Sequence, residues 1–197
     1  MNKRLGQTVV LLAAAAAVTA QANELSYDYV ELHYVDAEID VDGGGDVDGD
    51  GFAIDGSLAL TDNVHVFAGF QSLDFDFDVD LSAFEIGGGW NQSIATGTDF
   101  VARLSYIDGE IDTPIGDADD SGLGLAAGLR HFFTPEFEGG AFIRHVDLDE
   151  SGGETSFLVE GEYYLTERFT TGLSLEFGDD ATSWALGVRY YFDGLRR

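Results

Sequence analysis

Cysteine is absent from this sequence of 197 residues, lysine occurs once, at Lys3, and there are only 2 prolines. The lack of cysteine excludes disulfide bridges and thiol chemistry. Basic residues are scarce, because 9 Lys+Arg stand against 37 Asp+Glu and the formal net charge is −28. A chain this acidic is not attracted to nucleic acid, and it binds anionic lipid head groups only where divalent cations bridge the two.

Long apolar runs are also lacking beyond the N-terminus. The stretch VVLLAAAAAV at residues 9–18 is too short to cross a bilayer as a helix. Basic residues precede it and Ala20-Gln21-Ala22 follows it, which is the pattern of a secretory signal peptide. We therefore predict a signal peptide at residues 1–22 and one exported domain at residues 23–197. Without a cysteine after the apolar stretch, a lipoprotein is excluded.

Apolar residues in the exported part recur with a period of two. This alternation predicts β-strands with one apolar face, each about 9–11 residues long, the length that a tilted strand needs to cross a bilayer. Ten segments show it: residues 30–34, 52–60, 64–70, 84–90, 100–106, 123–129, 137–145, 157–165, 169–177 and 184–192. An even number of such strands predicts an all-β, up-and-down antiparallel transmembrane β-barrel with ten strands, with eight strands as the alternative.

The connections between these segments also alternate in length. Three short ones, LTDNV, FTPEF and LTERF, share the pattern apolar-Thr-x-x-apolar. Five are long and acidic, and we expect them to be extracellular loops: residues 36–50, 72–82, 108–121, 147–155 and 178–182. Short turns on one rim and long polar loops on the other are typical of an outer-membrane barrel, with both termini on the periplasmic side.

The second face of the strands separates a barrel from a soluble β-sandwich or lipocalin-like fold. It carries small residues together with charges of both signs, which suits a narrow polar lumen. We predict a lumen ion-pair network of Arg103, Arg130, Arg144 and Arg189 with Asp55, Glu85, Glu160, Glu162 and Glu176, with Glu31 on the same face. This network either fills the lumen or forms the constriction of a small pore.

The last predicted strand, ALGVRYYF at residues 185–192, resembles the signal that the outer-membrane insertion machinery recognises, through Gly187, Tyr190 and Phe192. The short turns resemble those of small OmpA/OmpX-type and porin-family β-barrel domains. LSYDYVELHYV, DFVARLSYID and FTPEFEG are similar to small proteobacterial outer-membrane barrels once linked to quorum sensing. The resemblance implies an outer-membrane location, contact with lipid and lipopolysaccharide, and a monomer. It says little about activity.

The stretch DVDGDG at residues 46–51 matches the first half of a calcium-binding loop. The twelfth position of such a loop should be glutamate but is Ser57, and the following residues alternate as in a strand. Asp46, Asp48 and Asp50 are therefore a weak candidate for Ca²⁺ or Mg²⁺, against a simple solvated loop. We predict no other cofactor.

Four histidines raise the possibility of an enzyme at the outer rim. His33 and His145 fall near the long connections, and His65 and His131 fall near the short turns. No motif of a serine hydrolase or zinc protease is present, so we predict that the protein is not an enzyme. The expected role is structural or in surface interaction, the alternative is a small porin for ions or small solutes, and a lipid- or peptide-modifying enzyme comes third.

Overall fold

The computed structural model describes residues 25–41 and 45–192, so the predicted signal peptide lies outside the described residues. No helix within those ranges is long and apolar enough to cross a membrane. The described chain forms ten strands: β1 (Tyr29–Val41), β2 (Gly45–Ala59), β3 (Val64–Phe75), β4 (Val79–Ala95), β5 (Thr98–Thr113), β6 (Gly116–Thr134), β7 (Phe137–Leu148), β8 (Gly152–Tyr164), β9 (Phe169–Phe177) and β10 (Ala181–Tyr191).

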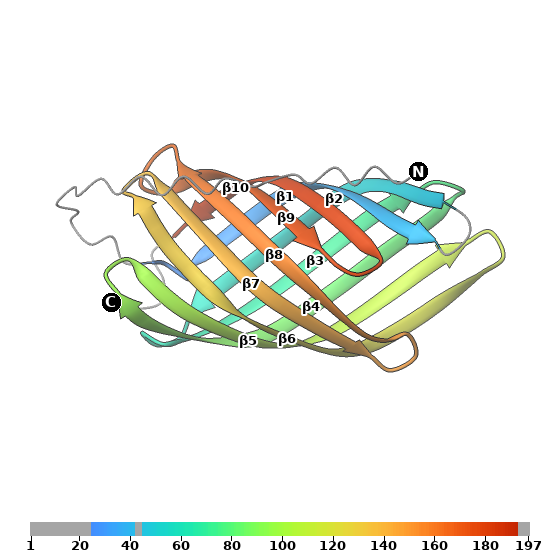
Figure 1. Ribbon diagram of the computed structural model, residues 1–197, viewed down its shortest axis with the longest axis horizontal. Helices are drawn as coiled ribbons and strands as arrows, with labels where there is room; N and C mark the ends of the chain where they lie inside the picture. Colours follow the sequence, from blue (N-terminus) through green and yellow to red (C-terminus); the bar gives the residue numbers. More distant parts are fainter. Residues whose placement is uncertain (1–24, 42–44, 193–197) are drawn as a thin grey trace, which may run out of the picture.

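Each strand pairs antiparallel with its neighbours in the sequence, and β1 pairs with β10 to close the barrel (Figure 1). At this closure Glu31 lies opposite Arg189 and His33 lies opposite Gly187. A closed barrel leaves no sheet edge, so the backbone hydrogen bonds of every strand have partners along the wall. The prediction of ten strands is confirmed, and the alternative of eight is wrong.

One end of the barrel has short turns, as predicted. Residues 60–63, 96–97, 135–136 and 165–168 form them, and we call this end the turn side. Within two of the turns the threonine side chain caps the bend: Thr166 Oγ1 accepts a hydrogen bond from Phe169 N at 3.0 Å, and Thr134 Oγ1 accepts one from Glu136 N at 3.3 Å. The repeated apolar-Thr-x-x-apolar pattern is therefore a turn motif that closes hairpins.

At the opposite end we predicted long acidic loops, but the structure has long hairpins with tight turns there. The acidic segments continue the strands, and β6 reaches 19 residues while the connections at 76–78, 114–115, 149–151 and 178–180 are tight. Figure 1 shows the β5–β6 hairpin extending well beyond its neighbours. We call this end the hairpin side. The alternation in LDFDFDVD at residues 73–80 predicts a strand extension, and β3 and β4 confirm it on both sides of the turn at 76–78. For the other acidic segments the charge suggested loops, but the chain keeps its period of two there, and this alternation supports a strand.

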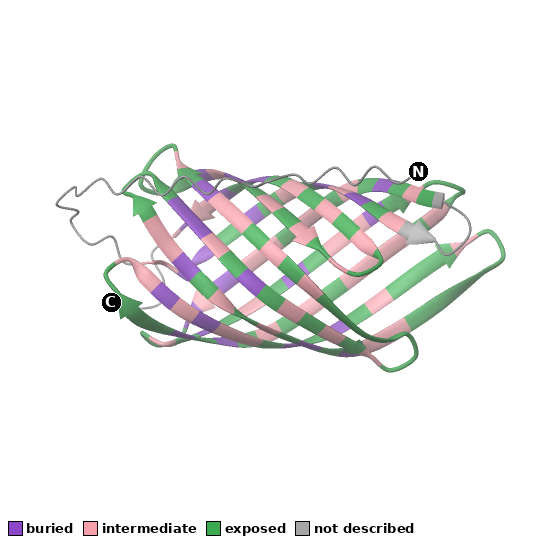
Figure 2. Ribbon diagram, in the orientation of Figure 1, coloured by how far each residue is buried: buried purple, intermediate pink, exposed green. Residues whose placement is uncertain are grey.

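The two faces of the wall are inverted relative to a soluble protein. Outward leucines are half exposed, with Leu104 at 58% and Leu186 at 53%, whereas the inward Arg130 is 1% exposed. Figure 2 shows the resulting alternation of exposed and less exposed positions along the strands. An apolar outer girdle around a charged interior is the arrangement expected of a barrel that is surrounded by lipid.

On the hairpin side this polarity reverses. Beyond the girdle the acids point outward, and apolar side chains point inward to form a small core of Val35, Ala37 and Leu73. Phe75 from the end of β3 and Leu81 from β4 pack against that core. The projecting hairpins therefore have a water-facing outer surface and an apolar inner surface.

Candidate functional site

The lumen is closed at the turn side by the chain that precedes β1. Tyr27 is 3% exposed, and its hydroxyl donates a hydrogen bond to Asp99 Oδ2 at 2.9 Å. Its ring stacks on His65 with centroids 4.6 Å apart and lies 4.7 Å from the Arg130 guanidinium. Strand β6, which carries Arg130, stands opposite β1 in the ring of ten, so Tyr27 reaches across the lumen. Sequence analysis placed no functional residue in this segment.

The base of the lumen is a buried ion pair. Arg130 Nε donates to Glu138 Oε1 at 2.8 Å, Tyr164 Oη donates to Glu138 Oε2 at 2.9 Å, and Arg130 Nη1 donates to the Ser26 carbonyl at 3.2 Å. Both charged side chains are 1% exposed. Glu138 was missed because it follows a turn directly. Glu138 and Phe142 lie an even number of positions apart on β7, so both face inward, and this spacing would have identified Glu138 as a lumen residue.

A second group of charges lies where β1 and β10 meet. Arg189 Nη2 lies 2.7 Å from Glu31 Oε2 and 3.5 Å from Glu162 Oε1, and the guanidinium stacks 4.4 Å above the Tyr29 ring. His33 Nε2 bridges Glu31 at 3.5 Å and Asp55 at 3.4 Å. Asp55 thus has a histidine as its partner, whereas we expected an arginine.

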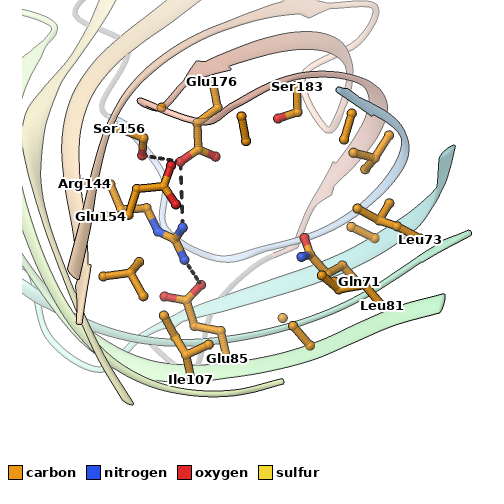
Figure 3. Close-up of a pocket in the computed structure, with 18 of the residues that line it drawn as sticks. Gln71, Leu73, Leu81, Glu85, Ile107, Arg144, Glu154, Ser156, Glu176 and Ser183 are labelled. Atoms are coloured by element: carbon orange, nitrogen blue, oxygen red, sulfur yellow. Dashed lines mark hydrogen bonds and ion pairs between the residues drawn. The ribbon is translucent and has the colours of Figure 1, made fainter. Parts of the chain in front are cut away.

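A third group of charged side chains lies closer to the hairpin side and is more exposed to water than the other two groups. Arg144 Nη2 lies 3.3 Å from Glu85 Oε2, and Arg144 Nη1 lies 3.7 Å from Glu176 Oε1 (Figure 3). Ser156 Oγ donates a further hydrogen bond to Glu176. The three charged side chains are about 30% exposed, against 5% or less for the Arg130–Glu138 pair and for Arg189 with Glu31 and Glu162. Hydration of the lumen charges thus rises from the turn side to the hairpin side.

Arg103 departs from the predicted network. Its guanidinium lies 5.4 Å from the Phe67 ring centroid and 5.5 Å from that of Phe142, and no carboxylate lies within ion-pair distance among the described residues. Its strand neighbours are Gly89 on β4 and Ala126 on β6, neither of which carries charge. Stacking on two aromatic rings is its main interaction. Glu160 likewise makes no ion pair within the described part of the chain.

Two cavities occupy the rest of the lumen. The one at the hairpin side has a volume of about 420 Å³, and the one in the middle has about 270 Å³. Asp55, Glu85, Arg144 and Glu176 line both, so the cavities adjoin. The largest fully buried side chains fill the turn side instead: Arg130, His65, Glu138, Val101 and Thr170. The lumen is therefore a vestibule with a packed base.

A row of aspartates crosses the outer face of the hairpin side. Successive members of the row are cross-strand partners from β1 to β6, so like charges face each other directly. The row is Asp36, Asp50, Asp74, Asp80, Asp112 and Asp117. The row gives the outer surface of the projecting hairpins a concentrated negative charge.

The candidate calcium ligands Asp46, Asp48 and Asp50 lie within β2 on its exposed face. Alternate residues of an extended strand are about 6.6–6.8 Å apart, so these carboxylates do not converge on one point. Among the described residues no group of three or more His, Cys, Asp or Glu side chains is placed to hold a metal ion.

The histidines considered for catalysis lie apart. His33 belongs to the Arg189 group in the lumen, and His145 Nδ1 lies 2.9 Å from Thr155 Oγ1 on the outer wall. Near the turns, His131 Nδ1 lies 2.8 Å from Thr98 Oγ1, and His65 is fully buried. The structure therefore brings no pair of these histidines into one site.

The residues of the predicted insertion signal lie on and just after β10. Gly187 faces the lumen, where an added Cβ would stand 2.7 Å from His33 Nδ1. Tyr190 packs on Phe169 with ring centroids 4.8 Å apart, and Phe192 N donates to the Asp28 carbonyl at 3.1 Å. Their role in insertion stays a prediction.

No protein-family model matches this chain, and no curated protein is similar to it in sequence. Among solved structures, a KdgM porin matches this chain at 10% sequence identity and a TM-score of 0.47. The match covers 84% of this chain and 99% of the porin. Ail, the attachment invasion locus protein of Yersinia pestis, matches at 16% sequence identity and a TM-score of 0.44, and the match covers 85% of this chain and 100% of Ail. The translocator domain of the autotransporter NalP from Neisseria meningitidis matches at 9% sequence identity and a TM-score of 0.48, and the match covers 87% of this chain and 91% of that domain. The fold assignment rests on the strand pairing of this chain itself.

Proposed function

We propose that this protein is an outer-membrane β-barrel with a structural or surface-interaction role. The observation that carries the proposal is the continuous girdle of half-exposed apolar side chains around a closed wall whose interior holds the charges. In water such a girdle would drive aggregation. In lipid it is solvated, and closure of the barrel satisfies the backbone polar groups that lipid cannot.

The orientation follows from the two ends. Short turns face the periplasm in bacterial barrels and longer projections face the outside, which supports periplasmic termini and exposed acidic hairpins. The partners that fit this placement are outer-membrane lipid, lipopolysaccharide and, during biogenesis, the insertion machinery, with the barrel itself a monomer. The link to quorum sensing stays a prediction, and we propose no catalytic role and no resident cofactor.

The runner-up is a small porin, favoured by the two adjoining cavities. Against it stands the packed base, where Tyr27, His65 and the Arg130–Glu138 pair fill the lumen from β1 to β6. We therefore propose that the barrel does not conduct ions in its resting form. The hairpins beyond the membrane then present the functional surface.

Two measurements test these proposals. Residues 23–197 refolded into detergent should migrate differently on a gel when boiled and unboiled, because a closed barrel resists cold SDS. A chain that is soluble without detergent and shows no shift contradicts the membrane assignment. Single-channel recording in a planar bilayer should then show no steady conductance, whereas regular open steps would establish the porin.

A further inference from the structure

We infer that the hairpin-side cavity is a binding site for a small organic cation with an apolar body. This site goes beyond the structural role proposed above. It is a separate property of the vestibule, and it needs neither a pore nor a catalytic group. The inference rests on the shape of the cavity, its apolar wall and the imbalance of charge at its floor.

The wall of the cavity is apolar where it projects beyond the girdle. It includes Val35, Leu73, Phe75, Leu81 and Val146, which come from four strands, β1, β3, β4 and β7. Its volume of about 420 Å³ falls in the range that takes a small ligand. An apolar surface that lines a water-filled cavity gains free energy when an apolar group displaces that water. Phe75, which also lines the cavity, is an aromatic side chain of the kind that attracts cations.

The floor of the cavity is negative. Arg144 is the one arginine there, and His33 contacts one of the carboxylates, Asp55, at 3.4 Å; the four carboxylates that line the cavity are Asp55, Glu85, Glu154 and Glu176. Arg144 is already shared between Glu85 and Glu176, whose side chains point to it in Figure 3. Its charge is therefore neutralised by its own neighbours, and the floor has an excess of negative charge that a ligand can compensate.

Glu154 shows this excess most clearly. It is an exposed side chain with no ion-pair partner within the described residues, and partial desolvation together with the nearby carboxylates of Asp180 and Glu176 raises its pKa, although Arg144 acts in the opposite direction. A group held near other carboxylates without a counter-ion gains from an added positive charge. The row of outward aspartates on the same hairpins draws cations toward the mouth of the vestibule.

Other ligand classes fit less well. Anions are repelled by the floor and by the acidic rim. A bare metal ion would lose hydration against apolar walls, and no described group of three acidic or histidine side chains replaces its water. A neutral apolar molecule would fill the wall but leave the carboxylates without a partner. An organic ammonium ion satisfies both regions, because its weakly hydrated charge sits on an apolar body.

The test uses the refolded chain in nanodiscs of zwitterionic lipid, with benzyltrimethylammonium as the probe. Methyl resonances of Leu73, Leu81 and Val146 should shift in a saturable way. Phenylacetate, which has a similar ring and opposite charge, should produce no saturable shift. Tetramethylammonium, which lacks the ring, should bind at least about fivefold more weakly, since the apolar contacts carry part of the affinity. Equal binding of the cation and the anion would overturn the inference.

A matched pair of variants separates the cavity from general surface charge. Glu154→Gln should weaken binding about fivefold, whereas Asp117→Asn, which removes the same charge from the outer face, should change it less than twofold. Because Glu154 makes no ion pair, its variant should fold normally. Glu176→Gln should also weaken binding, though it alters the Arg144 group. If Glu154→Gln and Asp117→Asn weaken binding equally, the probe is held by the diffuse acidic surface and the inference fails.

Discussion

Replacing Glu138 by glutamine should destabilise the barrel more than any other single removal of charge at the turn side. The change leaves the Arg130 guanidinium without its counter-charge in a place where both side chains are 1% exposed. Breaking a buried ion pair from one side costs about 3–5 kcal/mol, because the remaining charge stays desolvated. Glutamine still offers a carbonyl oxygen to Arg130, so we expect a loss near the lower limit, about 3 kcal/mol.

The matched control is Glu136→Gln, two residues earlier and exposed in the turn before β7. An exposed substitution of this kind changes the free energy of unfolding by less than about 0.5 kcal/mol. Urea unfolding of the barrel in vesicles, followed by fluorescence of Trp90 and Trp184, gives both values. A second check is the double variant Arg130→Met/Glu138→Leu, which removes both charges and should recover most of the lost stability.

Two results would refute this reasoning. If Glu138→Gln costs no more than Glu136→Gln, the ion pair does not stabilise the packed base. If the double variant is as unstable as Glu138→Gln alone, the loss comes from altered packing around Tyr164 and Ser26, and the unpaired charge is not its cause.

Three further predictions concern other parts of the barrel. Arg189→Met should lower the free energy of unfolding by about 2 kcal/mol more than Arg103→Met, because only Arg189 leaves buried carboxylates behind; equal losses in urea would contradict this. Partial desolvation and the facing carboxylate of Asp117 raise the pKa of Asp112, so the stability that Asp112 contributes is lost as pH rises through that pKa. A hydrogen bond from Ser151 lowers the pKa of Asp120, so the stability that Asp120 contributes is lost as pH falls through that pKa. A carboxyl NMR titration should place the two pKa values on opposite sides of 3.8. Gly51→Ala should destabilise the β2–β3 hairpin and speed the exchange of its amide hydrogens, because the new Cβ would stand 2.0 Å from the Ser72 carbonyl oxygen. The control Gly56→Ala should leave amide exchange unchanged, because the nearest atom to its new Cβ is 3.8 Å away.

The wall of the barrel was predictable because its cause is local. A period of two places Leu32, Ile54 and Leu186 on one face wherever the chain is extended, and the short turns oblige neighbouring segments to pair. The acidic segments were misassigned for a related reason. Their charge suggested loops, but inward Val35 and Ala37 continue the alternation into the first of these segments, which outweighs composition.

The choice of partners within the lumen was not predictable. Arg144 on β7 meets Glu85 on β4 and Glu176 on β9, and those contacts depend on how far each strand is staggered around the ring. The stagger also leaves Arg103 without a carboxylate, although it shares the inward face with several.

The alternation of side chains by itself therefore determined the closed wall, its apolar girdle and its charged interior. Only the tertiary structure decided that Tyr27 closes the turn side, that Glu138 is the counter-ion of Arg130, and that the hairpin side encloses an open cavity. The first set follows from the geometry of a single strand. The second depends on distances across the lumen, which exist only once all ten strands have closed.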